Sequence, residues 1–153
     1  MWVQQIFWWL VLFTGVLWFF KAYLNPVGGA WILEGDTDHP WELLQIGPWV
    51  FGEQKLAQGV HKFKGRLKSG VWHLSRRDHG SELFEAQGFP ATIAFLLSGR
   101  MMVEYALTYR AQDRCLVGTM VPLKVTFITD PPRLSHFSRQ PAVPFLLTKK
   151  TTM

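Results

Sequence analysis

The order of apolar and polar residues differs sharply between the two ends of the chain. Nineteen successive residues, from Trp2 to Phe20, carry no charge, and their side chains leave no continuous polar face. After Gly47, apolar residues instead recur at every second position in short runs separated by turn residues. The first pattern predicts a membrane-spanning helix, and the second predicts the strands of a sheet.

Residues 1–25 are expected to form an uncleaved, single-pass transmembrane anchor. A helix that ends before Asn25-Pro26 would be about 34 Å long, enough for a hydrocarbon core of about 30 Å. A cleavable signal peptide is the alternative, but no Lys or Arg precedes the apolar run and the residues after it are large. The residues expected to hold this helix in the bilayer are Trp2, Trp8, Trp9, Trp18, Lys21 and Tyr23.

Few charges indicate on which side of the membrane the rest of the chain lies. Lys21 follows the apolar run and no basic residue precedes it, so the positive-inside rule favours the cytoplasmic side. The single cysteine, Cys115, agrees with a reducing compartment, because it cannot form an intrachain disulfide. We expect Cys115 to be a small buried residue in a strand.

Three further segments follow the anchor. Residues 26–46 are expected to be a juxtamembrane connector with a short helix over 39–45, and residues 47–130 a β-rich domain. Residues 131–153 contain four prolines and are expected to form an extended C-terminal tail. Trp31 and Trp41 indicate that the connector is held, either on the lipid interface or against the domain.

The clearest hairpin signal covers residues 60–77. Two alternating runs flank Ser69-Gly70, a dipeptide typical of tight turns. If these two residues form the turn, Lys68 pairs with Val71, and the apolar residues share one face with Arg76 near its end. That face contains Phe63, Leu67, Trp72 and Leu74, and the opposite face contains Lys62, Lys64, Arg66, Lys68, His73 and Arg77.

Other segments predict further strands. Residues 91–97 and 100–109 flank Ser98-Gly99 and indicate a second hairpin, and residues 115–129 form one or two strands with an edge or bulge at Pro122. We therefore expect a single N-terminal transmembrane helix plus a small all-β domain. This domain would be an antiparallel β-sandwich or partly open barrel of about 6–7 strands, with no helix after residue 46.

The net charge is +5 and the pI is about 9.6. Six of the sixteen Lys and Arg residues lie between positions 62 and 77, so the basic hairpin face is the expected contact for an anionic partner. An acidic neighbouring subunit or anionic lipid headgroups fit this face, and a solvated surface that keeps the protein soluble is the alternative. Nucleic acid is not expected, because Phe63 and Trp72 belong to the other face and leave no stacking surface beside the charges.

No segment has a catalytic or metal-binding signature. The five histidines form neither a HExxH motif nor an i, i+4 pair, and there is no phosphate-binding loop or nucleophile elbow. His61 and Asp78, opposite one another in the expected hairpin, are the best candidates for a metal or acid–base site. His79 joins them if the chain turns there. We expect no metal, no cofactor and no enzymatic activity.

The anchor and the charge pattern together predict the function. We expect a non-enzymatic accessory or assembly subunit of an integral membrane protein complex, which binds a neighbouring subunit through the basic hairpin face. The alternative is a membrane-anchored domain that binds a lipid or a small ligand. Residues 47–54, Gly-Pro-Trp-Val-Phe-Gly-Glu-Gln, are distinctive but predict no mechanism.

Overall fold

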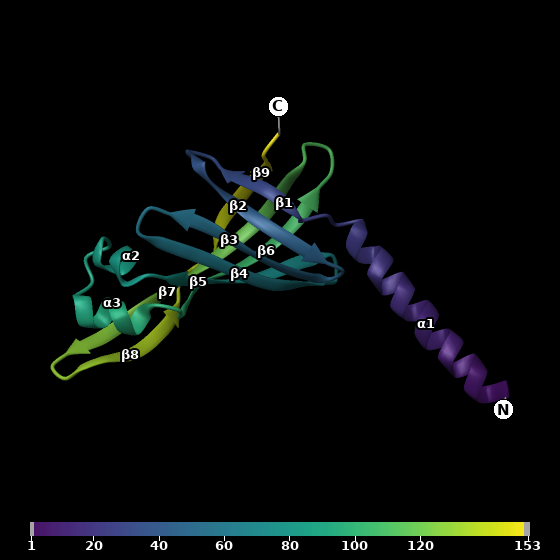
Figure 1. Ribbon diagram of the computed structural model, residues 1–153, viewed down its shortest axis with the longest axis horizontal. Coiled ribbons are helices and arrows are strands. Elements are labelled where there is room, and N and C mark those ends of the chain that lie inside the picture. Colours follow the sequence, from purple (N-terminus) through teal and green to yellow (C-terminus); the bar gives the residue numbers. More distant parts are fainter. Residues whose placement is uncertain (1, 152–153) are drawn as a thin grey trace.

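The computed structural model describes residues 2–151 and consists of one long helix and a β-barrel with a lateral arm (Figure 1). The helix, α1 (Trp2–Tyr23), extends away from the barrel, and all its described side chains except Ala22 are exposed. Within residues 2–151 it is the one helix long and apolar enough to cross a membrane. The expected N-terminal helix is therefore confirmed.

Eight antiparallel strands close into the barrel. They are β1 (Gly29–Leu33), β2 (Asp36–Ile46), β3 (Trp49–Leu56), β4 (Gly59–Lys68), β5 (Val71–His79), β6 (Met101–Arg110), β7 (Cys115–Thr129) and β9 (Val143–Lys149). Neighbours in the chain pair with one another from β1 to β7, and β9 closes the barrel between β7 and β1. The prediction of an all-β antiparallel domain is confirmed. The expected sandwich or partly open barrel of six or seven strands is wrong.

The additional strands come from segments expected to lie outside the domain. β1 and β2 occupy the expected connector, including the part predicted as a short helix, and β9 lies in the expected tail. Trp31 and Trp41 are buried in the barrel, not on a lipid interface. Because β9 forms backbone ladders with two strands and leaves no free edge there, closure stabilises a segment whose own sequence resembles a loose tail.

A lateral arm leaves the barrel where β7 passes Pro122. Up to this residue β7 pairs with β6, and beyond it β7 pairs with β8 (Pro132–Arg139). Pro122 has no N–H to donate, so it suits the point at which one ladder ends and the next begins. Two short helices, α2 (Ser81–Glu85) and α3 (Ala91–Leu97), pack against this hairpin in a second small core.

The first strand of the expected second hairpin is wrong, because residues 91–97 form α3. Ile93, Ala94 and Leu97 are buried on one face at helical spacing. A short apolar run fits either a helix or a strand, and here packing against the arm decides. The expectation of no helix after residue 46 is wrong for the same reason.

Aromatic side chains fill much of the barrel interior. Trp41 stacks on Phe63 with ring centroids 3.9 Å apart, and Tyr105 packs edge-on against Trp41 at 5.1 Å. Trp72 is fully buried, and its indole N–H donates to the carbonyl of Asn25 at 3.0 Å. The barrel core thus holds the chain directly after α1.

Candidate functional site

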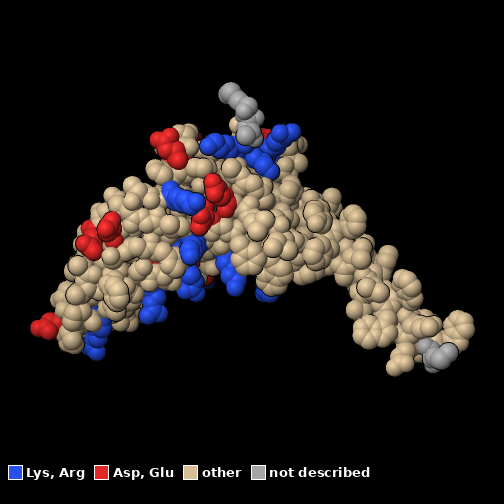
Figure 2. Space-filling view, in the orientation of Figure 1, with Lys and Arg blue, Asp and Glu red and all other residues tan. Residues whose placement is uncertain are grey.

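The six residues predicted for the basic hairpin face share one outer surface of the barrel. β4 and β5 pair in the predicted register, with Lys68 opposite Val71 and Lys62 opposite Arg77. Lys and Arg side chains gather along the lower edge of the domain, the side toward which α1 runs (Figure 2). The exposed residues that form this surface, which we call the basic face, are Lys62, Lys64, Arg66, Lys68, His73 and Arg77.

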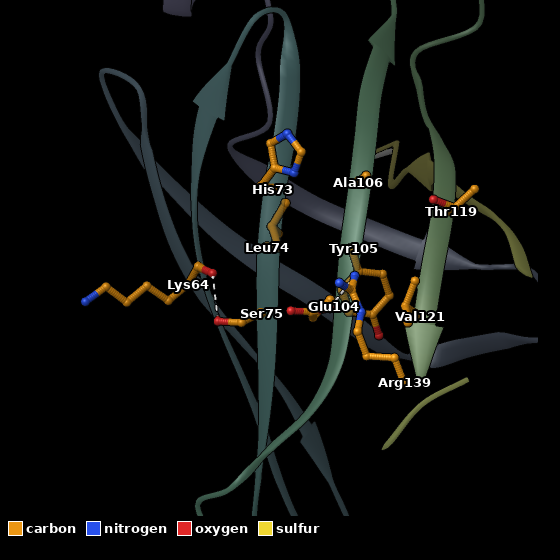
Figure 3. A pocket seen from close by; sticks show the side chains of 10 residues that line it. All are labelled: Lys64, His73, Leu74, Ser75, Glu104, Tyr105, Ala106, Thr119, Val121 and Arg139. Carbon is orange, nitrogen blue, oxygen red and sulfur yellow. Dashed lines mark hydrogen bonds and ion pairs between the residues drawn. The ribbon is translucent and has the colours of Figure 1, made fainter. Parts of the chain in front are cut away.

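A groove of about 290 Å³ crosses the basic face between β4 and β7 (Figure 3). Its floor consists of small side chains from three adjacent strands, Ser75, Ala106 and Thr119. Lys64 and His73 lie on one side of this floor, and Arg139, from the end of β8, reaches over it from the other. The sequence did not indicate that Arg139 would line this groove, because β8 was not predicted.

The charges of this surface are unevenly compensated. Arg139 Nη2 lies 2.7 Å from Glu104 Oε2, so the carboxylate in the groove already has a cationic partner. Lys64 extends over Phe51, with its ammonium 6.0 Å from the ring centroid. Within residues 2–151, no ion pair involves the four basic residues of β4. These charges are therefore available to an anionic partner.

An apolar surface that was not predicted from the sequence lies beside the basic face. Trp49 and Phe51 on β3 project outward, opposite Arg66 and Lys64 on β4. The alternation of residues 47–54 contained this signal. The closure of the barrel decides that Trp49 and Phe51 face outward, and that the residues alternating with them face inward.

His61 and Asp78 lie opposite one another, as predicted, but inside the barrel. His61 Nε2 is 3.6 Å from Asp78 Oδ1, and Asp78 is 2% exposed. Arg76, the one basic residue expected on the apolar face, binds Asp78 through Nε at 2.8 Å and Nη2 at 3.0 Å. β5 continues through His79, which therefore points to the opposite face and does not join them.

The other side of His61 is tied to Gln54. The Gln54 amide nitrogen donates to the carbonyl of His39 at 2.8 Å and to Asp36 Oδ2 at 3.1 Å, so its oxygen is left to accept from His61 Nδ1 at 3.0 Å. Burial, and secondarily the Arg76 charge, lowers the pKa of His61 from 6.5 to about 4. The imidazole is therefore neutral at pH 7.

This polar cluster closes the end of the barrel away from α1. Each of its buried side chains has a hydrogen-bond partner, Gln54 and His61 on neighbouring strands and Asp78 through Arg76 on its own strand, which is the usual state of polar groups in a core. Within residues 2–151, no three or more His, Cys, Asp or Glu side chains are grouped so that they could hold a metal. The cluster therefore has the geometry of buried polar side chains whose hydrogen bonds are made within the core.

Comparison with protein families, with curated proteins and with solved structures finds no match.

The junction between α1 and the barrel is held by Gln45. Its amide nitrogen donates to the carbonyl of Ala22 at 2.9 Å, and its oxygen accepts from the backbone N–H of Val27 at 2.8 Å. The predicted membrane residues Trp2, Trp8, Trp9, Trp18, Lys21 and Tyr23 are exposed along α1. Cys115 is buried at the start of β7, as predicted, and donates its thiol proton to Asp113 Oδ1 at 2.9 Å.

Proposed function

We propose that this protein is a non-enzymatic accessory or assembly subunit of a membrane protein complex. α1 spans the bilayer, and the barrel binds an acidic surface of a neighbouring subunit through the basic face. The observation that carries this proposal is the exposure of six basic or imidazole side chains on one surface, none of which forms an ion pair within residues 2–151.

The filled interior of the barrel supports a role for its surface. Aromatic rings pack its middle, and the polar cluster occupies one end. An eight-stranded barrel holds a small ligand when its side chains leave room for one. Here the groove lies on the outside, between β4 and β7.

The groove also suits a particular contact. A floor of small side chains lets a partner approach the sheet, and Lys64 and His73 then lie beside it. Both can donate to a carboxylate, and such charge-assisted bonds are stronger than neutral ones. An acidic side chain of a neighbouring subunit is therefore the expected occupant.

Copurification in mild detergent tests the proposal. The tagged full-length protein should elute as a complex, and Lys62→Glu/Lys64→Glu/Arg77→Glu should release the partner and leave a monomer. The matched control, Lys124→Glu/Arg133→Glu/Lys150→Glu, makes the same change of charge elsewhere on the surface and should retain it. A wild-type protein that extracts as a lone monomer, or equal loss in both variants, would contradict the proposal.

A further inference from the structure

Four large apolar side chains form a continuous surface on the outside of the barrel. Trp49 and Phe51 project from β3, and Ile46 and Leu44 are their cross-strand partners on β2. Their exposed fractions run from 39% for Phe51 to 61% for Leu44. We call this surface the apolar strip. Isolated exposed apolar residues are common, but a contiguous group marks a contact.

Contacts at the β2–β3 turn set the position of the strip relative to α1. Gly47 in this turn lies against Phe19, and a β carbon at Gly47 would be 2.7 Å from its ring. Phe19 lies about one helical turn before the end of α1 at Tyr23. If α1 spans a bilayer, the turn therefore lies where the hydrocarbon core meets the headgroups.

Charged residues frame the strip. On one side, Lys64 and Arg66 on β4 lie directly opposite its two aromatic residues. Farther from α1, the next outward pair on β2 and β3 consists of two acidic residues, Glu42 and Glu53. An apolar surface flanked by basic residues, with acidic residues farther from the helix, is the distribution that contact with anionic headgroups favours.

A hollow of about 290 Å³ lies where the strip meets α1. Trp18 of α1 forms one wall, and Pro48 and Trp49 form part of the barrel side. Arg66, Lys68 and Ser69 also line it. Two cations and a hydroxyl beside apolar rings suit the phosphate of a lipid whose acyl chains lie along the helix.

We infer that the apolar strip and this hollow form a second membrane contact, in which the strip enters the interfacial layer and Arg66 and Lys68 bind the phosphate of an anionic phospholipid. The inference rests on the proposed function in one respect, that α1 spans the bilayer. A bilayer is favoured over a protein as the occupant because the contact between Phe19 and Gly47 already brings the lipid surface to the strip.

This contact would orient the domain. With the β2–β3 side on the membrane, β4 and β5 rise from it, and the groove that contains Lys64 and His73 opens along the membrane surface. A subunit in the same membrane would meet the groove from the side.

Spin labels on the full-length protein in phospholipid vesicles test the inference. In a Cys115→Ala background, labels at Leu44→Cys, Leu10→Cys and Thr148→Cys report on the strip, on α1 and on β9, which lies across the barrel from β4. For each spin label, the collision rate with oxygen, which concentrates in lipid, is compared with the collision rate with a water-soluble nickel chelate. The labels at 44 and 10 should collide more often with oxygen, and the label at 148 should collide more often with the nickel chelate.

Lipid composition and charge reversal provide the second measurement. The label at 44 should be immersed more fully in vesicles of phosphatidylcholine with phosphatidylglycerol than in phosphatidylcholine alone. Arg66→Glu/Lys68→Glu should lower the ratio of docked to free domain about thirtyfold or more, because each basic residue near an anionic surface contributes about fivefold. Lys124→Glu/Arg133→Glu should leave the ratio unchanged.

The outcomes separate this inference from the proposed function. A label at 10 in lipid with a label at 44 in water overturns the membrane contact and leaves the spanning helix intact. A label at 44 that is shielded in native membranes but not in pure lipid vesicles identifies the strip as a protein interface, which also overturns the inference. A label at 10 in water overturns the spanning helix on which both proposals depend.

Discussion

Arg76 and Asp78, two residues apart on β5, both turn into the barrel and form a bidentate ion pair there. The two Arg76 nitrogens lie 2.8 and 3.0 Å from the two carboxylate oxygens, and Arg76 Nη1 also donates to the hydroxyl of Tyr105 at 3.3 Å. Residues at i and i+2 of a strand share a face, so a charge placed on the apolar face needs a partner on that same face. Asp78 is that partner.

Removing one member of this pair should destabilise the barrel strongly. Asp78→Ala leaves the Arg76 charge in the core without its counterion, and we expect a loss of about 3 kcal/mol or more in the free energy of unfolding. Arg76→Met/Asp78→Leu removes both charges and should lose less than the single variant. Urea unfolding in detergent measures both. A double variant less stable than Asp78→Ala would contradict this account.

Acid should destabilise the protein through His61. Its pKa is 6.5 when unfolded and about 4 when folded, so between these values the unfolded chain binds the proton and the folded chain does not. Stability is therefore fully present above pH 6.5 and falls as the pH drops toward 4, by at most about 1.4 kcal/mol per pH unit. Unfolding measured across this range should show the slope. His61→Gln should flatten it, whereas His73→Gln, on the exposed basic face, should keep it.

Gln45 should control the orientation of α1. Gln45→Ala removes the bonds to Ala22 and Val27, each contributing about 1 kcal/mol, and should broaden the distribution of distances between spin labels at Phe13→Cys and Thr148→Cys. Gln140→Ala is the control, because the Gln140 side chain donates to Ser138 at 3.4 Å, away from α1. An equally narrow distribution in Gln45→Ala would show that other contacts hold the helix.

Gly118 on β7 should not tolerate a methyl group. A β carbon there would lie 1.9 Å from the carbonyl oxygen of Ala106 on β6, so the two strands would have to separate. We expect Gly118→Ala to lose about 3 kcal/mol, at the upper end of overpacking costs. Gly28→Ala is the matched control, since its β carbon would have its nearest neighbour at 3.5 Å. Similar unfolding midpoints for the two variants would contradict the clash.

Features that depend on interactions between residues close in the chain could be predicted from the sequence, and features that depend on contacts between distant segments could not. The β4–β5 hairpin could be predicted residue by residue, because alternation and a two-residue turn both act within the hairpin. α3 could not, because a run of seven residues, six of them apolar, fits both the helical and the strand period, and packing against the arm decides between them. At the candidate site, the six basic-face residues were predicted, whereas Arg139 and the apolar strip depend on strands that meet through barrel closure.

By itself, the sequence determined the long apolar helix, the sorting of charged and apolar side chains onto opposite faces of β4 and β5, and the position of Asp78 opposite His61. The tertiary structure decided that β9 closes the barrel against β1 and that His61 and Asp78 lie inside the barrel. It also decided that Trp49 and Phe51 point outward, on the strand that follows the turn in contact with α1. The reason is that side-chain periodicity specifies which residues share a face. The backbone hydrogen bonds that join strands are nearly independent of sequence, so the choice of partner is made by the packing of the whole barrel.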